Sequence, residues 1–166
     1  LYASGWHDRD AKIPAYPQAL FKIASIAKLY DASAVAKLHA SDILSVDKTL
    51  ADYMPELVGR IQYANEITLR MMVQHTSGIP NFTDQPEYRW DESSLDVLEF
   101  ALDKPANFKP GTDYAYSNTN YLLLSKIMSR VLGYPVGDFM RNEMFVPLGL
   151  KNTYFSVNEV NIEDLM

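Results

Sequence analysis

The amino-acid sequence predicts a single, mainly α-helical domain. Apolar residues recur at helical spacing in about five or six segments, helix-capping residues precede several of these, and glycine or proline follows their ends. Hardly any segment alternates between apolar and polar residues as a half-buried strand does. The length of 166 residues suits one domain, and a hydrophobic content of 48% is sufficient to fill its core.

The first residues predict a strand that is followed by a loop. Leu1 and Ala3 show strand-like alternation before a turn at Gly5, as if the chain enters the strand partway. A proline-containing loop then leads to the most helix-like segment, an alanine-rich stretch from about Phe21 to His39.

Three shorter helices are predicted next. The segment VDKTLADYMP indicates a short helix that Pro55 stops. The segment ITLRMMVQHTSGIP indicates another, with Thr68 as its N-cap and a glycine and a proline just beyond its end. Ser93 and Asp96 then form a capping-box pattern before a helix that continues to about Leu102.

The last third of the chain predicts two more helices. Asn118 or Asn120 can cap a helix that ends at Gly133, and a further helix is expected from Val136 to about Phe145. No repeat, linker or low-complexity segment divides the sequence, so we expect these elements to form one globule.

Charge and composition exclude several classes of function. Lys and Arg number 15 against 21 Asp and Glu, and the net charge of -6 argues against nucleic acid or anionic membranes as partners. The sequence has no cysteine, and its 3 histidines lack the spacing of metal ligands, so we expect no metal site and no cofactor. No apolar run approaches the roughly 20 residues of a transmembrane helix, and the N-terminus lacks the features of a signal peptide.

The segment FKIASIAKLY places a serine and a lysine three positions apart in the predicted helix. At this spacing, Ser25 and Lys28 lie on the same face and their side chains can touch. A serine hydroxyl becomes a nucleophile when a neighbouring base removes its proton, and a lysine can be that base when desolvation keeps its amine neutral. The flanking residues predict such apolar surroundings: Ile23, Ala24, Ile26, Ala27 and Leu29.

This motif alone is not specific. Its structural alternative is a serine at a helix start followed by a lysine whose amine reaches solvent. A second copy, SVDK, occurs at residues 45–48, in a polar turn beside Asp47 where Lys48 is expected to stay solvated and charged. We therefore select Ser25 and Lys28 as the catalytic candidates.

A second candidate group lies in the segment YAYSNTNY. Tyr116 and Asn118 occupy a loop immediately before a predicted helix, a place from which a phenol and an amide can project into a cleft. Beside a cationic lysine, Tyr116 can act as a general acid and base, and Asn118 can donate to a substrate carbonyl. The alternative is that Tyr116 is a packing aromatic and Asn118 a helix cap. The similar stretch Tyr63-Ala64-Asn65 lies in a polar link and is not selected.

The chain resembles the penicillin-recognising serine hydrolases related to class C β-lactamases in four successive segments: FKIASIAKLY, MMVQHTSGIP, YAYSNTNY and FVPLGLKNTYF. That superfamily includes D-alanyl-D-alanine carboxypeptidases, D-aminopeptidases and β-lactamase-like esterases. The resemblance covers essentially all 166 residues. It implies that Ser25 is the acylated nucleophile and Lys28 its proton acceptor. It further implies that Tyr116 is a general acid and base and that Asn118 positions the substrate.

The resemblance also implies a fold. Residues 1–20 would be a strand remnant and loop of the α/β part of a β-lactamase-like, transpeptidase-like domain, and residues 21–166 its nucleophile helix and helical subdomain. HTSG is a landmark of the family, in which we expect His75 and Ser77 to be structural. The family completes its site with a K-T-G or H-x-G strand, and no such triad occurs in the sequence. We therefore expect a truncated chain, inactive alone or dependent on a missing C-terminal segment of the same protein.

The leading functional prediction is a serine hydrolase that forms an acyl-enzyme intermediate with an ester, a D-amino-acid peptide or a β-lactam. Its substrate would be a small-molecule or peptide acyl compound, and the resemblance favours a periplasmic or secreted location. The first alternative is a non-catalytic relative that binds peptidoglycan-type peptides or a protein partner. The second is an all-helical interaction module in which the motifs are coincidental.

Overall fold

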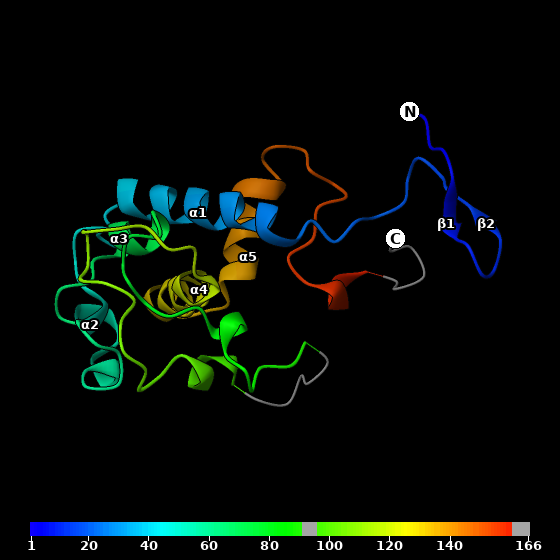
Figure 1. The fold of residues 1–166 in the computed structure, drawn as a ribbon. Helices are drawn as coiled ribbons and strands as arrows, with labels where there is room; N and C mark the ends of the chain where they lie inside the picture. Colours follow the sequence, from blue (N-terminus) through cyan, green and yellow to red (C-terminus); the bar gives the residue numbers. More distant parts are fainter. Residues whose placement is uncertain (91–95, 161–166) are drawn as a thin grey trace. The chain divides into compact units, whose positions relative to one another are not determined.

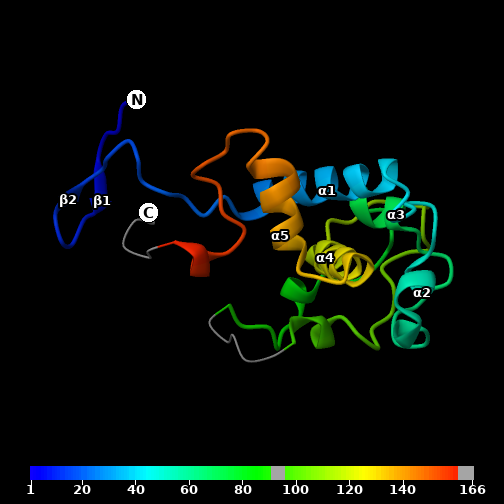
Figure 2. The ribbon, with the colours of Figure 1, turned by 180° about the vertical axis from the view of Figure 1, so that it is seen from behind.

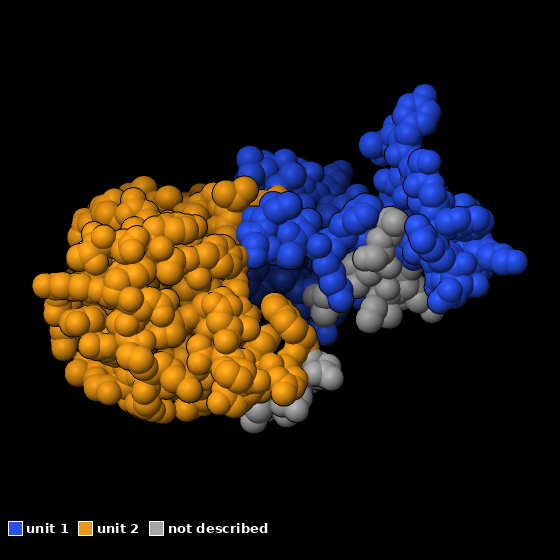
Figure 3. All heavy atoms as spheres, in the orientation of Figure 1, with its two compact units in different colours: residues 1–27, 137–166 blue, residues 28–136 orange. Residues whose placement is uncertain are grey.

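The structure is a computed structural model in which residues 1–90 and 96–160 are described, and most of their regular structure is helical (Figure 1). This confirms the predicted fold class. The chain divides into two compact units, Lys28–Val136 and a second unit of Leu1–Ala27 with Gly137–Met166 (Figure 3). The sequence contains no linker that marks this division.

The core of the unit Lys28–Val136 is built around helix α4 (Asn118–Leu132). Helix α4 contacts α1 (Lys28–Ala40) and α3 (Leu69–Val73), and it is seen nearly end-on beside them in Figures 1 and 2. Burial of its apolar face removes hydrocarbon from water, which is the main source of stability in such a core. Four apolar side chains of α4 have no exposed surface: Leu123, Leu124, Ile127 and Met128.

Two short helices lie where the sequence predicts them, one stopped before Pro55 and one capped by Thr68. Helix α2 (Leu50–Tyr53) has Thr49 as its N-cap in a capping box, and it gives way to a 3-10 helix at Pro55–Leu57. Thr68 caps α3, because its side-chain oxygen accepts the backbone N–H of Met71 at 3.3 Å. These predictions are confirmed.

Helix α1 begins later than predicted. The sequence predicts a helix from about Phe21, whereas the structure has a 3-10 helix at Ala24–Ala27 and an α-helix only from Lys28. Ala24 has a φ of 47°, in the left-handed region that a right-handed helix does not contain. The high helix propensity of this alanine-rich stretch therefore does not determine where the helix starts.

The predicted N-caps of α4 are wrong, while its predicted end is confirmed. Asn118 and Asn120 lie inside the helix, and Ser117 is the N-cap residue but makes no side-chain capping bond. Gly133 ends the helix with a φ of 77°, a conformation that glycine adopts without a steric penalty.

The segments outside these helices are mostly short turns of helix. Asp96 caps a 3-10 helix at Val97–Phe100, where the sequence predicts a helix to Leu102, and Ser93 lies outside the described residues. The span predicted for one helix near the C-terminus contains two: α5 (Val136–Met140) and a π-helix at Arg141–Phe145. Further 3-10 helices are Phe82–Asp84 and Val157–Glu159.

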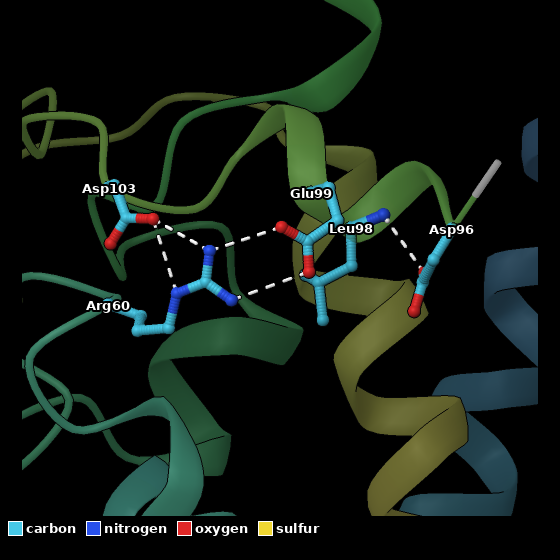
Figure 4. Close-up of polar contacts among 5 residues, drawn as sticks. All are labelled: Arg60, Asp96, Leu98, Glu99 and Asp103. Carbon is cyan, nitrogen blue, oxygen red and sulfur yellow. Dashed lines mark hydrogen bonds and ion pairs between the residues drawn. The ribbon is translucent and has the colours of Figure 1, made fainter.

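Arg60, which follows α2 and its adjoining 3-10 helix, forms ion pairs with residues in and just after the 3-10 helix Val97–Phe100. Its guanidinium donates to Asp103 Oδ2 at 2.7 Å and to Glu99 Oε2 at 3.1 Å, as Figure 4 shows. Hydrogen bonding to Arg60 lowers the pKa of Asp103 below its usual value. All three side chains are substantially exposed, so we expect this network to contribute modestly to stability.

The unit of residues 1–27 and 137–166 contains the one sheet found in the described part of the chain. Strand β1 (Trp6–Asp8) pairs antiparallel with β2 (Ile13–Pro14). The prediction of a strand through Leu1 and Ala3 is wrong, because pairing starts only after Gly5 and both residues are exposed.

Candidate active site

Lys28 is the first residue of α1, and its amine points to residues at the start of α4. The Nζ atom donates to Asn118 Oδ1 at 2.8 Å. It also lies 5.1 Å from the ring centroid of Tyr116 and 5.5 Å from that of Tyr121, within the range of cation–π contacts. The side chain is half-buried. Its amine is therefore held in a defined place instead of extending freely into solvent.

Tyr116 lies in the extended segment that precedes α4. Its side chain is 40% exposed, and its hydroxyl donates to Asn118 Oδ1 at 3.4 Å. Asn118 Oδ1 thus accepts from both the amine of Lys28 and the phenol of Tyr116. The structure brings together three of the four predicted site residues, within one unit, around a single amide oxygen.

Ser25, the fourth predicted residue, lies in the 3-10 helix Ala24–Ala27 that ends where α1 begins. It is exposed and belongs to the other unit, so its relation to Lys28 rests on their three-residue separation along the chain. The predicted apolar surroundings are not formed by the flanking side chains, because Ile26 and Leu29 are 60% and 69% exposed. The rings of tyrosines from other segments partly cover the lysine instead.

Asn81 is a residue of this site that the sequence interpretation missed. Its side-chain Oδ1 accepts the backbone N–H of Asn118 at 3.0 Å and also the Asn118 side-chain Nδ2 at 3.3 Å. Thr83 Oγ1 accepts the same Nδ2 at 3.2 Å. Both N–H groups of the Asn118 amide are therefore used inside the protein, which orients its oxygen toward Lys28. A substrate carbonyl would have to replace one of these contacts to bind the amide.

Asp31 is a second missed residue, one turn after Lys28 on α1. Burial raises its pKa from 3.8 to about 6, although the positive charge of Lys28 acts in the opposite direction. Burial also raises the pKa of Tyr121, and the charge of Asp31 contributes to that rise. The i, i+3 spacing from Lys28 was the available sequence signal, since it places both side chains on one helix face.

The HTSG segment is hydrogen-bonded to the first turn of α4. Ser77 is 1% exposed, and its hydroxyl donates to Asn120 Oδ1 at 2.7 Å while accepting the N–H of Ile79. Gly78 has a φ of 76°, and a Cβ atom there would lie 2.2 Å from the backbone oxygen of Phe108. Only glycine fits this position.

The second copies of both motifs lie apart from this cluster, as predicted. Lys48 is exposed, and neighbouring Asp47 forms an ion pair with Arg70 at 2.8 Å. Asn65, at the end of the second Y-x-N stretch, is exposed too. Neither copy has the contacts that join Lys28, Tyr116 and Asn118.

Comparison with known proteins identifies the family. The sequence pattern of the beta-lactamase family matches residues 1–164. The chain belongs to the beta-lactamase family. This confirms the resemblance to the penicillin-recognising serine hydrolases. The matched residues include Lys28, Tyr116 and Asn118.

Proteins of known structure share the fold. D-amino acid amidase from Ochrobactrum anthropi SV3, solved with L-phenylalanine amide, has a TM-score of 0.84 and 30% identity over 98% of this chain. The penicillin binding protein from Bacillus halodurans has a TM-score of 0.82 at 23% identity, a similarity of fold alone. Among curated sequences, Penicillin-binding protein 4* of Bacillus subtilis (strain 168) is 27% identical over 92% of this chain.

The chain spans only part of these relatives. It covers 46% of the amidase and 34% of Penicillin-binding protein 4*. Within residues 1–90 and 96–160, no helix has both the length and the apolar character needed to cross a membrane.

Proposed function

We propose that this chain carries the acylating residues of a serine hydrolase. The observation that supports this most is the cluster of Lys28, Tyr116 and Asn118, which lies at the start of the helix that follows Ser25. An amine and a phenol that share one amide oxygen can accept and return a proton, which is what a serine nucleophile requires.

In the proposed reaction, Ser25 Oγ attacks the acyl carbon of the substrate, and its proton passes to Lys28 Nζ. Collapse of the tetrahedral intermediate breaks the bond to the leaving group, which takes a proton from the Tyr116 hydroxyl. Water then attacks the resulting ester and gives a proton to the Tyr116 phenolate. Ser25 Oγ leaves with the proton that Lys28 holds, which releases the acid and restores all three groups. Asn118 keeps the amine and the phenol at one place through both steps.

The relatives support a proposal for the substrate class. Similarity to a D-amino acid amidase and to penicillin-binding proteins favours an ester or a D-amino-acid amide or peptide first, and a β-lactam second. We also propose that residues 1–166 alone do not turn over substrate. The sequence contains no K-T-G or H-x-G triad, and loss of one oxyanion donor costs roughly 2.7 to 4 kcal/mol in related chemistry.

The test is covalent labelling of the full-length protein with a fluorescent penicillin and with an activated ester. We expect a label on Ser25, no label in Ser25→Ala, and much slower labelling in Lys28→Ala. The second motif copy offers matched controls, because Ser45→Ala and Lys48→Ala should label at the normal rate. Labelling at another residue, or none with either reagent, would show that the proposal is wrong.

A further inference from the structure

His75 is buried among the rings of three tyrosines near Lys28. Its side chain is 8% exposed. Three tyrosine rings surround it, with centroids 4.6 Å (Tyr116), 5.2 Å (Tyr121) and 6.0 Å (Tyr114) from that of the imidazole. The ring closest to His75 belongs to the candidate acid and base.

The hydrogen bonds of His75 identify its protonation state. Nδ1 lies 3.1 Å from the backbone N of Ser117, a group that can only donate. It also lies 3.4 Å from Asn120 Nδ2, and that amide is oriented with its oxygen toward the Ser77 hydroxyl. Two donors therefore face one ring nitrogen, which must present a lone pair. The imidazole is neutral, and its proton is on Nε2.

His75 holds the chain on both sides of Tyr116. Its carbonyl oxygen accepts the N–H of Ala115 at 3.0 Å, while its Nδ1 accepts the N–H of Ser117. The two residues that flank Tyr116 are thus bonded to a single residue, on which the Tyr116 ring also stacks. Ser117 has no exposed surface, so its N–H has no access to water if the acceptor is lost.

We propose that neutral His75 is a positioning residue, which sets Tyr116 over the Lys28 amine, and that protonation of its Nδ1 displaces Tyr116 and lowers the rate of acylation. This inference rests on the proposed function of Tyr116. A protonated Nδ1 could not accept the N–H of Ser117, because two N–H donors would then face each other. The segment from Ala115 to Asn118 would then lose the contact that fixes its course.

The groups that face His75 favour its neutral form. Among the described residues, these are Lys28 from α1, Tyr121 from α4, and Tyr114 and Tyr116 from the segment before α4. Burial, and then the positive charge of Lys28, lower the pKa of His75 below its ordinary 6.5. Asp31 interacts electrostatically with Lys28 and Tyr121. The loss of rate should therefore occur on the acid side of neutrality.

Two substitutions distinguish the role of the Nδ1 hydrogen-bond acceptor from that of the stacked ring. His75→Asn keeps an oxygen acceptor near the place of Nδ1, does not titrate, and tolerates the local φ of 59°, since asparagine is enriched in this region. His75→Phe keeps the stacked ring but has no acceptor. We expect His75→Asn to acylate within about threefold of the unmodified rate at pH 8 and to lose the acid-side fall. We expect His75→Phe to lose about tenfold to a hundredfold in rate with little change in KM, as a misplaced catalytic group does.

Nuclear magnetic resonance supplies a readout that does not need activity. In ¹⁵N spectra of the imidazole we expect an unprotonated Nδ1 and a protonated Nε2 at neutral pH, and Tyr116 signals that shift as His75 titrates. An Nδ1–H tautomer, Tyr116 signals that ignore this titration, or a normal acylation rate in His75→Phe would overturn the inference. If the unmodified protein does not acylate at all, the proposed function fails, and the spectra alone decide the role of His75.

Discussion

Replacement of Asn81 by alanine should destabilise the protein, because this residue caps α4 from a distant part of the chain. The N-cap residue Ser117 makes no side-chain capping bond, whereas Asn81 Oδ1 accepts the N–H of Asn118 at 3.0 Å. Asn81 is 7% exposed, and its Nδ2 also donates to Thr83 and Asp84, each at 2.8 Å. Asn81→Ala removes all these contacts at once.

The expected magnitude follows from these contacts. Loss of a helix cap costs about 1 kcal/mol, and leaving buried polar groups without a partner costs about 1 to 3 kcal/mol. We therefore expect a total of roughly 2 to 4 kcal/mol in the free energy of unfolding, measured by urea denaturation followed by circular dichroism. Asn65→Ala, at an exposed asparagine, is the control and should change the value by less than about 0.5 kcal/mol.

The same substitution should slow acylation. Without Asn81, the Asn118 amide loses one of the two acceptors that orient it, so its Nδ2 can more easily turn toward the Lys28 amine, which offers only donors. The reasoning is refuted if Asn81→Ala unfolds within 0.5 kcal/mol of the unmodified protein. A denatured-state effect would instead appear as a changed slope of unfolding free energy against urea.

Three further predictions test other parts of the structure. Because the pKa of Asp31 is raised to about 6, the folded chain binds more protons than the unfolded chain between about pH 4 and 6. The free energy of unfolding should therefore fall as pH rises through this window. Asp31→Asn should abolish that fall, which denaturation at several pH values would show. Gly78→Ala should cost more than about 2 kcal/mol by thermal unfolding, since it combines a positive φ with a backbone collision. Gly133→Ala, with a similar φ but open space, should cost only about 1 kcal/mol. Arg60→Ala should lower the urea midpoint of unfolding only slightly, and less in high salt, because its ion pairs are exposed; a large fall in the midpoint would contradict this.

Local chemistry allowed some helix ends to be predicted from the sequence. Thr68 and Gly133 act through atoms within a few residues of themselves, so their roles are visible in a short window. The cap of α4 was not visible, because Asn81 and Asn118 are separated by 37 positions along the chain. Only the folded chain shows that the segment after HTSG lies against the start of that helix.

The candidate site was partly predictable, because short sequence motifs mark its residues but not the contacts around them. Motif order and spacing selected Lys28, Tyr116 and Asn118, and the structure places them around one amide oxygen. The source of the lysine's burial was not predictable, because it comes from the rings of Tyr116 and Tyr121 and not from the apolar neighbours of Lys28 in sequence. Periodicity describes which residues share a face, but it does not say what covers that face.

The charge of Lys28 connects the two titratable groups that the sequence interpretation did not assign to the chemistry. Its positive charge lowers the pKa of His75 and limits the rise in the pKa of Asp31, because a positive charge at residue 28 repels a protonated His75 and attracts an ionised Asp31. In the proposed reaction, that charge arises when the amine takes the proton of Ser25. Protonation of His75 and Asp31 as pH falls would each make this uptake less favourable. Two side chains on different segments therefore act in the same direction on one proton transfer.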